Sequence, residues 1–137
     1  MVDRISPERR TEIMRTVRSK NTGPEILVRK AAYRLGLRFR LHAKHLPGKP
    51  DLVFRKWNTV VFVNGCFWHR HLGCKKASLP KTNVEFWQKK FTDNVRRDEV
   101  NYRRLAESGW RVVVLWQCHV RTIEEAAALL GQYFPTQ

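Results

Sequence analysis

Two apolar runs lie close together in the segment 51-DLVFRKWNTVVFVN-64, with only a Lys-Trp-Asn stretch between them. Each run is too short for a helix and is rich in branched and aromatic residues, which is typical of buried strands. A third run of the same kind, 110-WRVVVLWQ-117, follows a long polar stretch. We therefore predict that strands over 51–55, 59–64 and 110–117 form the centre of one sheet.

The segments around these strands carry helix signals. Thr22 and Glu25 fit a capping box, in which a side-chain oxygen accepts from an exposed amide of the first turn, and Thr82 and Glu85 repeat the pattern. We predict helices over 6–18, 22–36 and 82–107, another from 122 onward, and an alternating strand over 37–41. This order predicts an α/β fold, a single domain over residues 1–137 with a mixed β-sheet flanked by helices.

The charge of the chain points to its partner. The 137 residues include 27 Lys and Arg against 12 Asp and Glu, a formal net charge of +15. Basic residues occur throughout the chain rather than in a tail, which favours a folded nucleic-acid-binding surface; a ribosomal-type protein and a membrane-surface binder are the alternatives. No run approaches the roughly 18 apolar residues of a membrane span, so we expect a cytoplasmic protein without a membrane partner.

The cysteines are grouped with histidines. The segment 66-CFWHRHLGC-74 holds two of the three cysteines, and the third follows the last predicted strand. Disulfides are rare in the cytoplasm, whereas structural Zn²⁺ takes four nitrogen and sulfur ligands in a tetrahedron. The candidate ligands are Cys66, His71, Cys74 and Cys118. Two alternatives stay open, namely His69 in place of His71, or unligated core cysteines.

A second constellation contains ligands for a hard cation. Asp51 begins one predicted strand, and Asn64 and His69 follow the next. Mg²⁺ prefers oxygen ligands and keeps several waters, so one carboxylate with a backbone carbonyl and a phosphate suffices, and a nearby histidine can act as general base. The alternative for Asp51 is a turn residue after Pro50, and Glu25 fits a purely structural role in its capping box.

Aromatic and basic residues indicate a DNA-contacting surface. Phe67 and Trp68 stand inside the cysteine loop, where two large rings are hard to bury, although a core aromatic pair is the alternative. In the helix predicted over 82–107, the 3.6-residue period defines an apolar face that we expect to be core: Val84, Phe91, Val95 and Tyr102. An adjoining stripe suits base edges and phosphates, with an ordinary solvated face as the alternative: Trp87, Lys90, Asn94 and Arg97.

Together these motifs resemble the very-short-patch repair (Vsr) endonucleases, bacterial enzymes that nick DNA at a T:G mismatch. The resemblance runs from about residue 7 to residue 120, and its most specific part is the Gly-Cys-Phe-Trp-His run at 65–69 with the downstream cysteines. The matching segments are 16-TVRSKNTGPE-25, 46-LPGKPDLVF-54, 61-VFVNGCFWHRH-71, 83-NVEFWQKKFTDNVRRD-98 and 107-ESGWRVVVLWQC-118. The resemblance implies a fold like that of type II restriction endonucleases (PD-(D/E)xK-like), with a structural zinc site.

The resemblance also implies roles for single residues. Asp51 and the Val63 carbonyl would bind Mg²⁺, with Glu25 supporting the site and His69 as the catalytic base. The zinc ligands would be Cys66, His71, Cys74 and Cys118. The DNA contacts would come from Met14, Phe67, Trp68 and Trp87 as wedges, and from Lys90 and Asn94 as mismatch readers.

The chain departs from the family at the end of one strand. Where well-known members have Thr-His, this chain has Val63-Asn64. An amide cannot take up a proton as an imidazole can, so three interpretations are open: His69 is the sole base, the enzyme is slow, or Asn64 was introduced to trap a complex. We group Asn64 with the candidate catalytic residues.

We therefore predict a Mg²⁺-dependent endonuclease that nicks one strand of duplex DNA at a T:G mismatch, and we expect it to act as a monomer. The alternatives are a nickase of matched duplex sites and a catalytically weak or silent zinc-containing DNA-binding module. The resemblance further implies coupling to mismatch-repair proteins, at the nucleoid of a bacterial cell.

Overall fold

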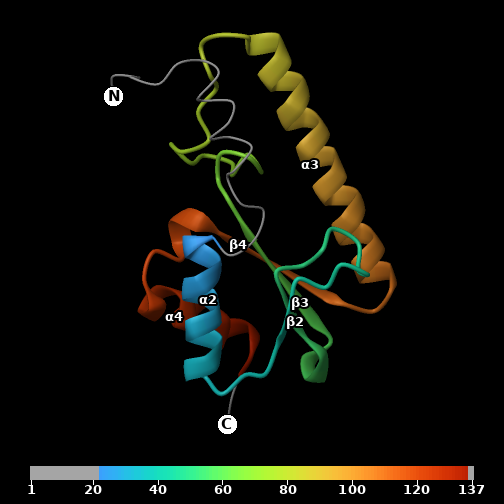
Figure 1. The fold of residues 1–137 in the computed structure, drawn as a ribbon, viewed down its shortest axis with the longest axis vertical. Coiled ribbons are helices and arrows are strands. Elements are labelled where there is room, and N and C mark those ends of the chain that lie inside the picture. Colours follow the sequence, from blue (N-terminus) through green and yellow to red (C-terminus); the bar gives the residue numbers. More distant parts are fainter. Residues whose placement is uncertain (1–21, 136–137) are drawn as a thin grey trace.

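A computed structural model describes residues 22–135 of the chain (Figure 1). Its elements follow the order α2 (Gly23–Arg34), β1 (Arg40–Leu41), β2 (Leu52–Phe54), β3 (Thr59–Asn64), α3 (Val84–Glu107), β4 (Arg111–Trp116) and α4 (Ile123–Tyr133). Short 3₁₀ turns follow β2 at Arg55–Trp57 and β4 at Gln117–His119. The helix predicted over 6–18, and with it Met14, lies outside the described residues.

The four strands form one mixed sheet in the order β1-β2-β3-β4. The first two pairs are antiparallel, whereas β3 and β4 run parallel. The connection between β2 and β3 turns back at Asn58, whose φ of 48° is left-handed backbone that asparagine tolerates better than most residues. A parallel pair needs a long crossover, which includes α3. The predicted mixed sheet flanked by helices is confirmed.

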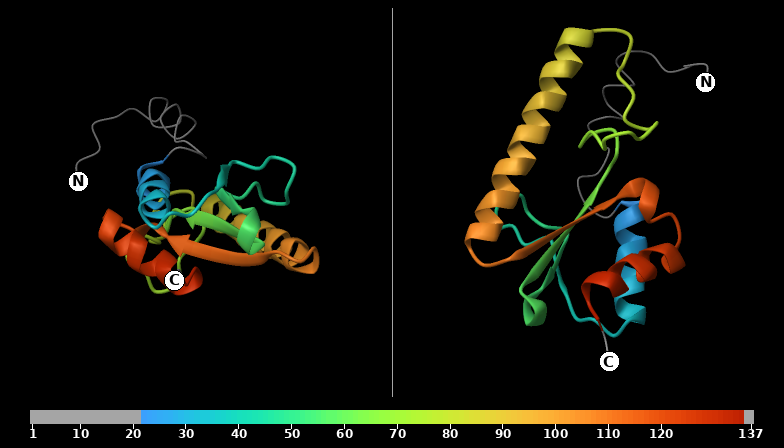
Figure 2. Two further views of the ribbon diagram at one scale, coloured as in Figure 1. Left: turned by 90° about the horizontal axis from the view of Figure 1, so that it is seen from below. Right: turned by 180° about the vertical axis from the view of Figure 1, so that it is seen from behind.

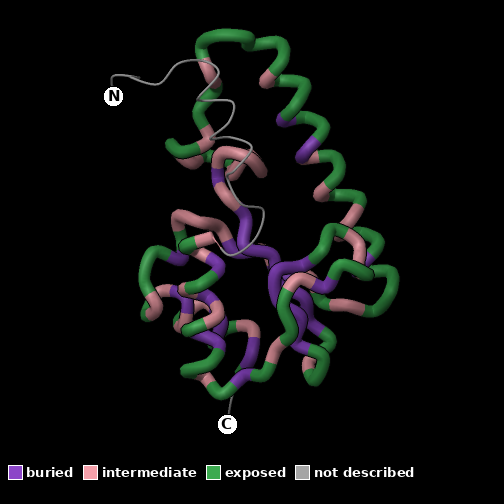
Figure 3. The backbone as a smooth tube through the Cα atoms, in the orientation of Figure 1, coloured by how far each residue is buried: buried purple, intermediate pink, exposed green. Residues whose placement is uncertain are grey.

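Helices cover the two faces of the sheet unequally (Figures 1 and 2). On one face α2 and α4 pack together, and Val28 and Leu130 meet Phe54 in an apolar core. On the other face the C-terminal part of α3 contacts the strands, with Leu105 in a smaller core beside Phe62. The first half of α3 projects past the sheet next to the loop 65–83, and Figure 3 shows that burial is concentrated in the strands and the two shorter helices.

The two predicted capping boxes have different outcomes. The Thr22 hydroxyl accepts from the Glu25 amide at 3.4 Å, as the first box requires. The second box is wrong, because Asn83 and not Thr82 precedes the first turn of α3. Asn83 has a left-handed φ of 53°, and its side chain makes no cap hydrogen bond within the described chain. The left-handed backbone at Asn83, where the loop 65–83 enters the helix, therefore replaces the cap that Thr82 was predicted to provide.

The strand predicted over 37–41 is mostly wrong. Only Arg40–Leu41 pairs with β2. Leu37 is drawn into the core formed with α2, and Phe39 packs against the same core, so the first part of this segment follows the helix instead of the sheet edge.

The predicted core face of α3 is wrong at its first turn. Val84 is exposed because the helix begins beyond the sheet. The buried residues of the helix are Phe91, Asn94 and Leu105, and Tyr102 and Val95 are half-buried. The buried residues thus include one polar side chain, Asn94, that an apolar pattern does not select. No helix in the described part combines the length and apolar character needed to cross a membrane.

Candidate active site and metal centre

The parallel pairing of β3 and β4 explains how two distant cysteines meet. The strands stay in register up to Asn64 and Trp116, and a cysteine follows two residues after each. Cys66 and Cys118 therefore leave the sheet side by side. The intervening loop then turns back, with the His71 amide donating to the Cys66 carbonyl at 3.0 Å and the Cys74 amide donating to the His71 carbonyl at 3.2 Å.

The four candidate zinc ligands form a compact group. The three sulfur atoms and the His71 nitrogen all lie within 4.8 Å of one another. His71 Nδ1 is 3.6 Å from Cys66 Sγ and 3.3 Å from Cys118 Sγ. Tetrahedral Zn²⁺, with bonds of about 2.3 Å to sulfur and 2.0–2.1 Å to nitrogen, requires such pairs to lie about 3.5 Å apart. The residues fit a zinc ion, and His71 rather than His69 stands among the cysteines.

The surroundings of His71 suit a metal ligand. Its ring stacks on Trp116 with the centroids 4.4 Å apart, which fixes its orientation. Burial and the neighbouring His119 lower the pKa of His71, so the ring stays neutral and keeps a lone pair for a cation. Burial also raises the pKa of Cys66 to about 11, and a thiolate at this position needs a bound cation nearby.

We expect His71→Ala and Cys118→Ala to lose zinc to a chelator that the parent protein resists, because each removes one of the four ligands. His69→Ala is the matched control and should keep its zinc, since His69 lies outside the cluster. Metal analysis after dialysis of all variants against the same chelator measures this. A His71→Ala protein that holds zinc as firmly as the parent would exclude His71 from the site.

A second group of metal-ligand side chains gathers where β2 begins. Asp51, Glu25 of α2 and His42 of the preceding loop each offer one ligand atom, and these atoms lie within 4.8 Å of one another. Glu25 and Asp51 are buried, at 2% and 8% exposure. The Val63 amide donates to Asp51 Oδ2 at 2.6 Å. Val63, predicted as a ligand through its carbonyl, is thus seen to contact the site through its N–H.

Two buried carboxyl groups share this site, and burial opposes the charge on Asp51. Burial raises the pKa of Asp51 to about 8, and Glu25 adds to the effect, although the Val63 amide partly offsets it. The Arg29 guanidinium lies 3.4 Å from Glu25 Oε2 and donates to His42 Nε2 at 3.0 Å. The Arg29 guanidinium faces Glu25, and a hard dication bound in this group would favour the ionised form of Asp51.

This arrangement predicts that Asp51→Asn stabilises the protein in the absence of added divalent cations. Between about pH 4 and pH 8 the unfolded chain releases the Asp51 proton while the folded chain keeps it, so the free energy of unfolding falls as the pH rises through this range. The amide avoids this loss and still accepts from Val63. We expect a melting temperature at least about 3 °C above that of the parent at pH 8.5, with the difference shrinking towards pH 4. Equal melting at pH 8.5 would contradict the shift.

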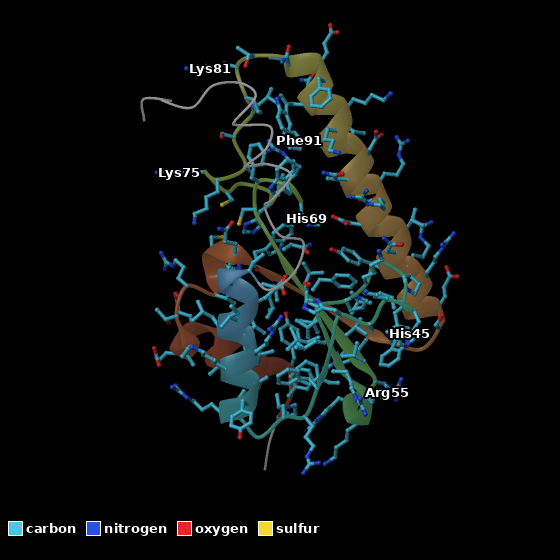
Figure 4. All side chains as sticks on the ribbon, in the orientation of Figure 1. His45, Arg55, His69, Lys75, Lys81 and Phe91 are labelled. Carbon is cyan, nitrogen blue, oxygen red and sulfur yellow. The ribbon has the colours of Figure 1, made fainter. Side chains whose placement is uncertain are left out.

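His69 is held by an acid that the sequence reasoning missed. His69 Nδ1 lies 2.5 Å from Asp98 Oδ2, and both side chains are partly exposed. With Nδ1–H donated to the carboxylate, Nε2 keeps its lone pair and can accept a proton. Figure 4 shows His69 between the loop and α3, so the loop supplies the imidazole and the helix supplies the carboxylate that orients it.

Asn64 is buried at the end of β3, at 4% exposure. Its Nδ2 donates to the Tyr102 hydroxyl at 2.7 Å. Tyr102 lies one helical turn after Asp98 on α3, and its ring contacts Phe62 with the centroids 4.9 Å apart. Asn64 is therefore tied to α3, in the region between the Asp51 group and the His69–Asp98 pair.

The predicted aromatic wedges form one cluster with Phe91. The Phe67 ring lies 5.2 Å from Trp68, 5.9 Å from Trp87 and 5.1 Å from Phe91, between centroids. All three wedge candidates are half-buried, and they lie where the loop meets the first half of α3. Arg70 makes a cation–π contact with this cluster, with its guanidinium 3.9 Å from the centre of the Phe91 ring. The rings thus stand at the surface in a group that the loop and α3 hold together.

The two predicted mismatch readers differ in exposure. Lys90 is exposed. Asn94 is 7% exposed, donates to the Trp68 carbonyl at 3.3 Å and accepts from Arg97 at 3.0 Å. In this structure Asn94 therefore fastens the loop to α3, and its predicted contact with a base stays a prediction.

Asp98 could have been found in the sequence, whereas His42 could not. One face of α3 carries residues three or four positions apart, namely Phe91, Asn94, Asp98 and Tyr102. A search for polar residues on this face would have selected Asp98. His42 has a left-handed φ of 49°, which the loop before β2 imposes and no local pattern reveals.

Comparison with known proteins gives this geometry a context. The family model described as DNA mismatch endonuclease Vsr matches residues 2–76. The type II nicking enzyme V.XorIIP of Xanthomonas oryzae pv. oryzae is 49% identical over 95% of this chain and 95% of its own length. V.NmeAIP of Neisseria meningitidis, also named a type II nicking enzyme, is 42% identical over 88% of this chain and 86% of its own. The DNA mismatch endonuclease Vsr of Escherichia coli K12 is 38% identical over 91% and 80%.

These relatives place the chain in the class of DNA nicking endonucleases, which have DNA as substrate. It belongs to the Vsr DNA mismatch endonuclease family.

Proposed function

We propose that the chain hydrolyses one phosphodiester bond in one strand of duplex DNA at a fixed site, with Asp51 and His69 on opposite sides of the scissile phosphate. One observation carries this proposal. The Asp51 group and the His69–Asp98 pair come from separate elements and are linked across the end of β3, through Val63 on one side and Asn64 with Tyr102 on the other. A cation-binding carboxylate and an oriented base are the two groups that such a hydrolysis needs.

Mg²⁺ is the cation that best suits the Asp51 group, because both carboxylates are hard oxygen ligands. Asp51 would hold the ion, and Glu25 would share its charge from α2. When bound, the ion supplies Lewis-acid stabilisation of the negative charge that develops on the phosphate. The cluster of Cys66, His71, Cys74 and Cys118 would hold Zn²⁺ with no open ligand position, which is the pattern of a structural site.

His69 is the proposed general base. Asp98 holds Nδ1, so Nε2 faces the substrate side and removes a proton from water as the water oxygen attacks phosphorus. The bond from phosphorus to the 3′-oxygen breaks and that oxygen takes a proton from a second water molecule, which leaves a 3′-hydroxyl and a 5′-phosphate. The half-buried cluster of Phe67, Trp68 and Trp87 is the proposed wedge that opens the base stack beside the cut, and Lys90 contacts the DNA next to it.

The relatives support a fixed duplex site as substrate, and a T:G mismatch is the second candidate. The two relatives that share 49% and 42% identity are named type II nicking enzymes. The name of the E. coli relative, at 38% identity, specifies a mismatch, as does the description of the matching family model. The wedge cluster suits either substrate, because a mismatch only lowers the cost of unstacking.

A nicking assay separates these candidates. The protein is first incubated with Mg²⁺ and closed circular DNA that carries many short sequences, with EDTA as the control. Matched and T:G duplexes are then built on any sequence that is cut and are tested in the same way. Nicks at a fixed matched site support the main proposal. Nicks confined to T:G duplexes support the second candidate. Binding without any nick in Mg²⁺ or Mn²⁺ would reject both and leave a DNA-binding module.

We further infer that the fold is that of type II restriction endonucleases, that the chain acts as a monomer, and that mismatch-repair proteins are its partners if the T:G substrate holds. The mixed sheet with its cation group where β2 begins supports the first inference.

A further inference from the structure

The Tyr102 hydroxyl lies close to the candidate catalytic residues, and the proposed mechanism gives it no role. Asp98 is one helical turn away on α3 and holds His69. Asn64 of β3 donates to the hydroxyl, and the preceding residue of that strand, Val63, donates its amide to Asp51. Burial is the main cause that raises the pKa of Tyr102, and the Asp98 and Asp51 carboxyl groups add to it.

The hydrogen-bond pattern leaves the proton of this hydroxyl available. A phenol oxygen can accept and donate at the same time. Its oxygen accepts from Asn64 Nδ2 at 2.7 Å, and no acceptor for its own proton occurs among residues 22–135. The Tyr102 ring packs on Phe62 and beside Leu105, so the hydroxyl is held firmly at one point. The hydroxyl is therefore a fixed donor beside Asn64, one helical turn along α3 from the Asp98 that holds His69.

We propose that Tyr102 is a further catalytic residue, whose hydroxyl donates a hydrogen bond to a non-bridging oxygen of the scissile phosphate while Asn64 holds the phenol oxygen in place. This proposal rests on the proposed nicking function. A donor at this point stabilises the charge that grows on the phosphate oxygens during attack, and the raised pKa keeps it protonated across the neutral range. Asn64 thereby acquires a role that does not require it to accept a proton.

The test uses Tyr102→Phe, which removes only the hydroxyl and keeps the ring on Phe62. The matched control is Tyr33→Phe, a change at an exposed tyrosine of α2. Single-turnover nicking at saturating protein, on a duplex that the parent cuts, should slow roughly 10- to 100-fold in Tyr102→Phe and stay unchanged in Tyr33→Phe. The Kd for the same duplex without divalent cation should change less than about 2-fold.

A second readout distinguishes contact with the phosphate from support of Asn64. Sulfur is introduced separately at each non-bridging position of the scissile phosphate. The parent should be slowed by sulfur at the position that Tyr102 contacts, and Tyr102→Phe should lose that sensitivity while keeping the response at the other position. Asn64→Ala leaves the hydroxyl in place, so it should retain the sensitivity and lose less rate than Tyr102→Phe.

Two outcomes would overturn the proposal while the parent still nicks: an unchanged rate in Tyr102→Phe, or a reduced rate that keeps the sulfur effects of the parent. A parent that binds DNA and never nicks would instead overturn the proposed function, and the two failures are thereby separated. Thermal melting of each variant checks that the fold is retained.

Discussion

Replacing Asp51 with alanine should lower the single-turnover nicking rate by at least ~1,000-fold, because the side chain that would hold the catalytic cation is lost. Affinity for the duplex should change little. Asp51 is buried, at 8% exposure, so it contributes little to the surface that attracts DNA, and the lysines and arginines of the outer surface remain. The measurements are a nicking time course in Mg²⁺ and a binding titration without it.

The matched control for this prediction is Asp93→Ala, an exposed carboxylate on α3 that contacts neither candidate site. It should nick at the rate of the parent. If Asp51→Ala retained a tenth or more of the parent rate, a barrier change of about 1.4 kcal/mol or less, Asp51 would not be the essential ligand. A large loss of affinity in Asp51→Ala alone would show a role in binding instead.

Replacing His69 with alanine should slow nicking by roughly 10²- to 10⁴-fold, the usual contribution of a positioned acid–base group. The loss should be partly recovered by added imidazole, which can enter the space that the side chain leaves and take up the proton from water. Single-turnover nicking with and without imidazole measures both effects. Asp98→Ala should cause a smaller loss, because it leaves the base present, imposes no tautomer on it and removes only the carboxylate that orients it.

His45→Ala serves as the histidine control. Figure 4 places His45 near the other end of α3, away from His69, and its side chain is exposed. It should nick normally and show no response to imidazole. A His69→Ala protein with full activity would remove His69 from the mechanism and leave the Asp98 carboxylate as the nearest candidate base.

The grouping of the three cysteines with a histidine could be predicted from the sequence, because strand register sets its geometry. Cys66 and Cys118 each follow a buried strand by two residues, and a parallel in-register pair brings such positions together. The sequence left His69 and His71 as alternatives. Only the course of the loop separates them, since the amide of His71 is bound to the Cys66 carbonyl and its ring rests on Trp116.

The Asp51 group was predictable only in part. The position of Asp51 at a strand start could be read from the apolar runs, whereas its contact with Glu25 depends on how α2 packs on the sheet. Asp98 was missed because the core face of α3 was defined by apolar residues alone. A helix that borders an active site carries polar groups on its inner face, and here Asn94 is buried while Asp98 is partly exposed.

The topology of the sheet also has a consequence for the time course of folding. β3 and β4 pair along their whole length, yet α3 and the loop 65–83 lie between them in the chain. Such a pairing joins distant segments, and the entropy lost in closing the intervening chain makes it a slow step. Cys66 and Cys118 stand immediately beyond the two strand ends, so zinc bound early would hold those ends together before the strands pair. The cluster would then accelerate the assembly of the sheet, and the rate at which newly made chains become competent would depend on the zinc supply of the cell.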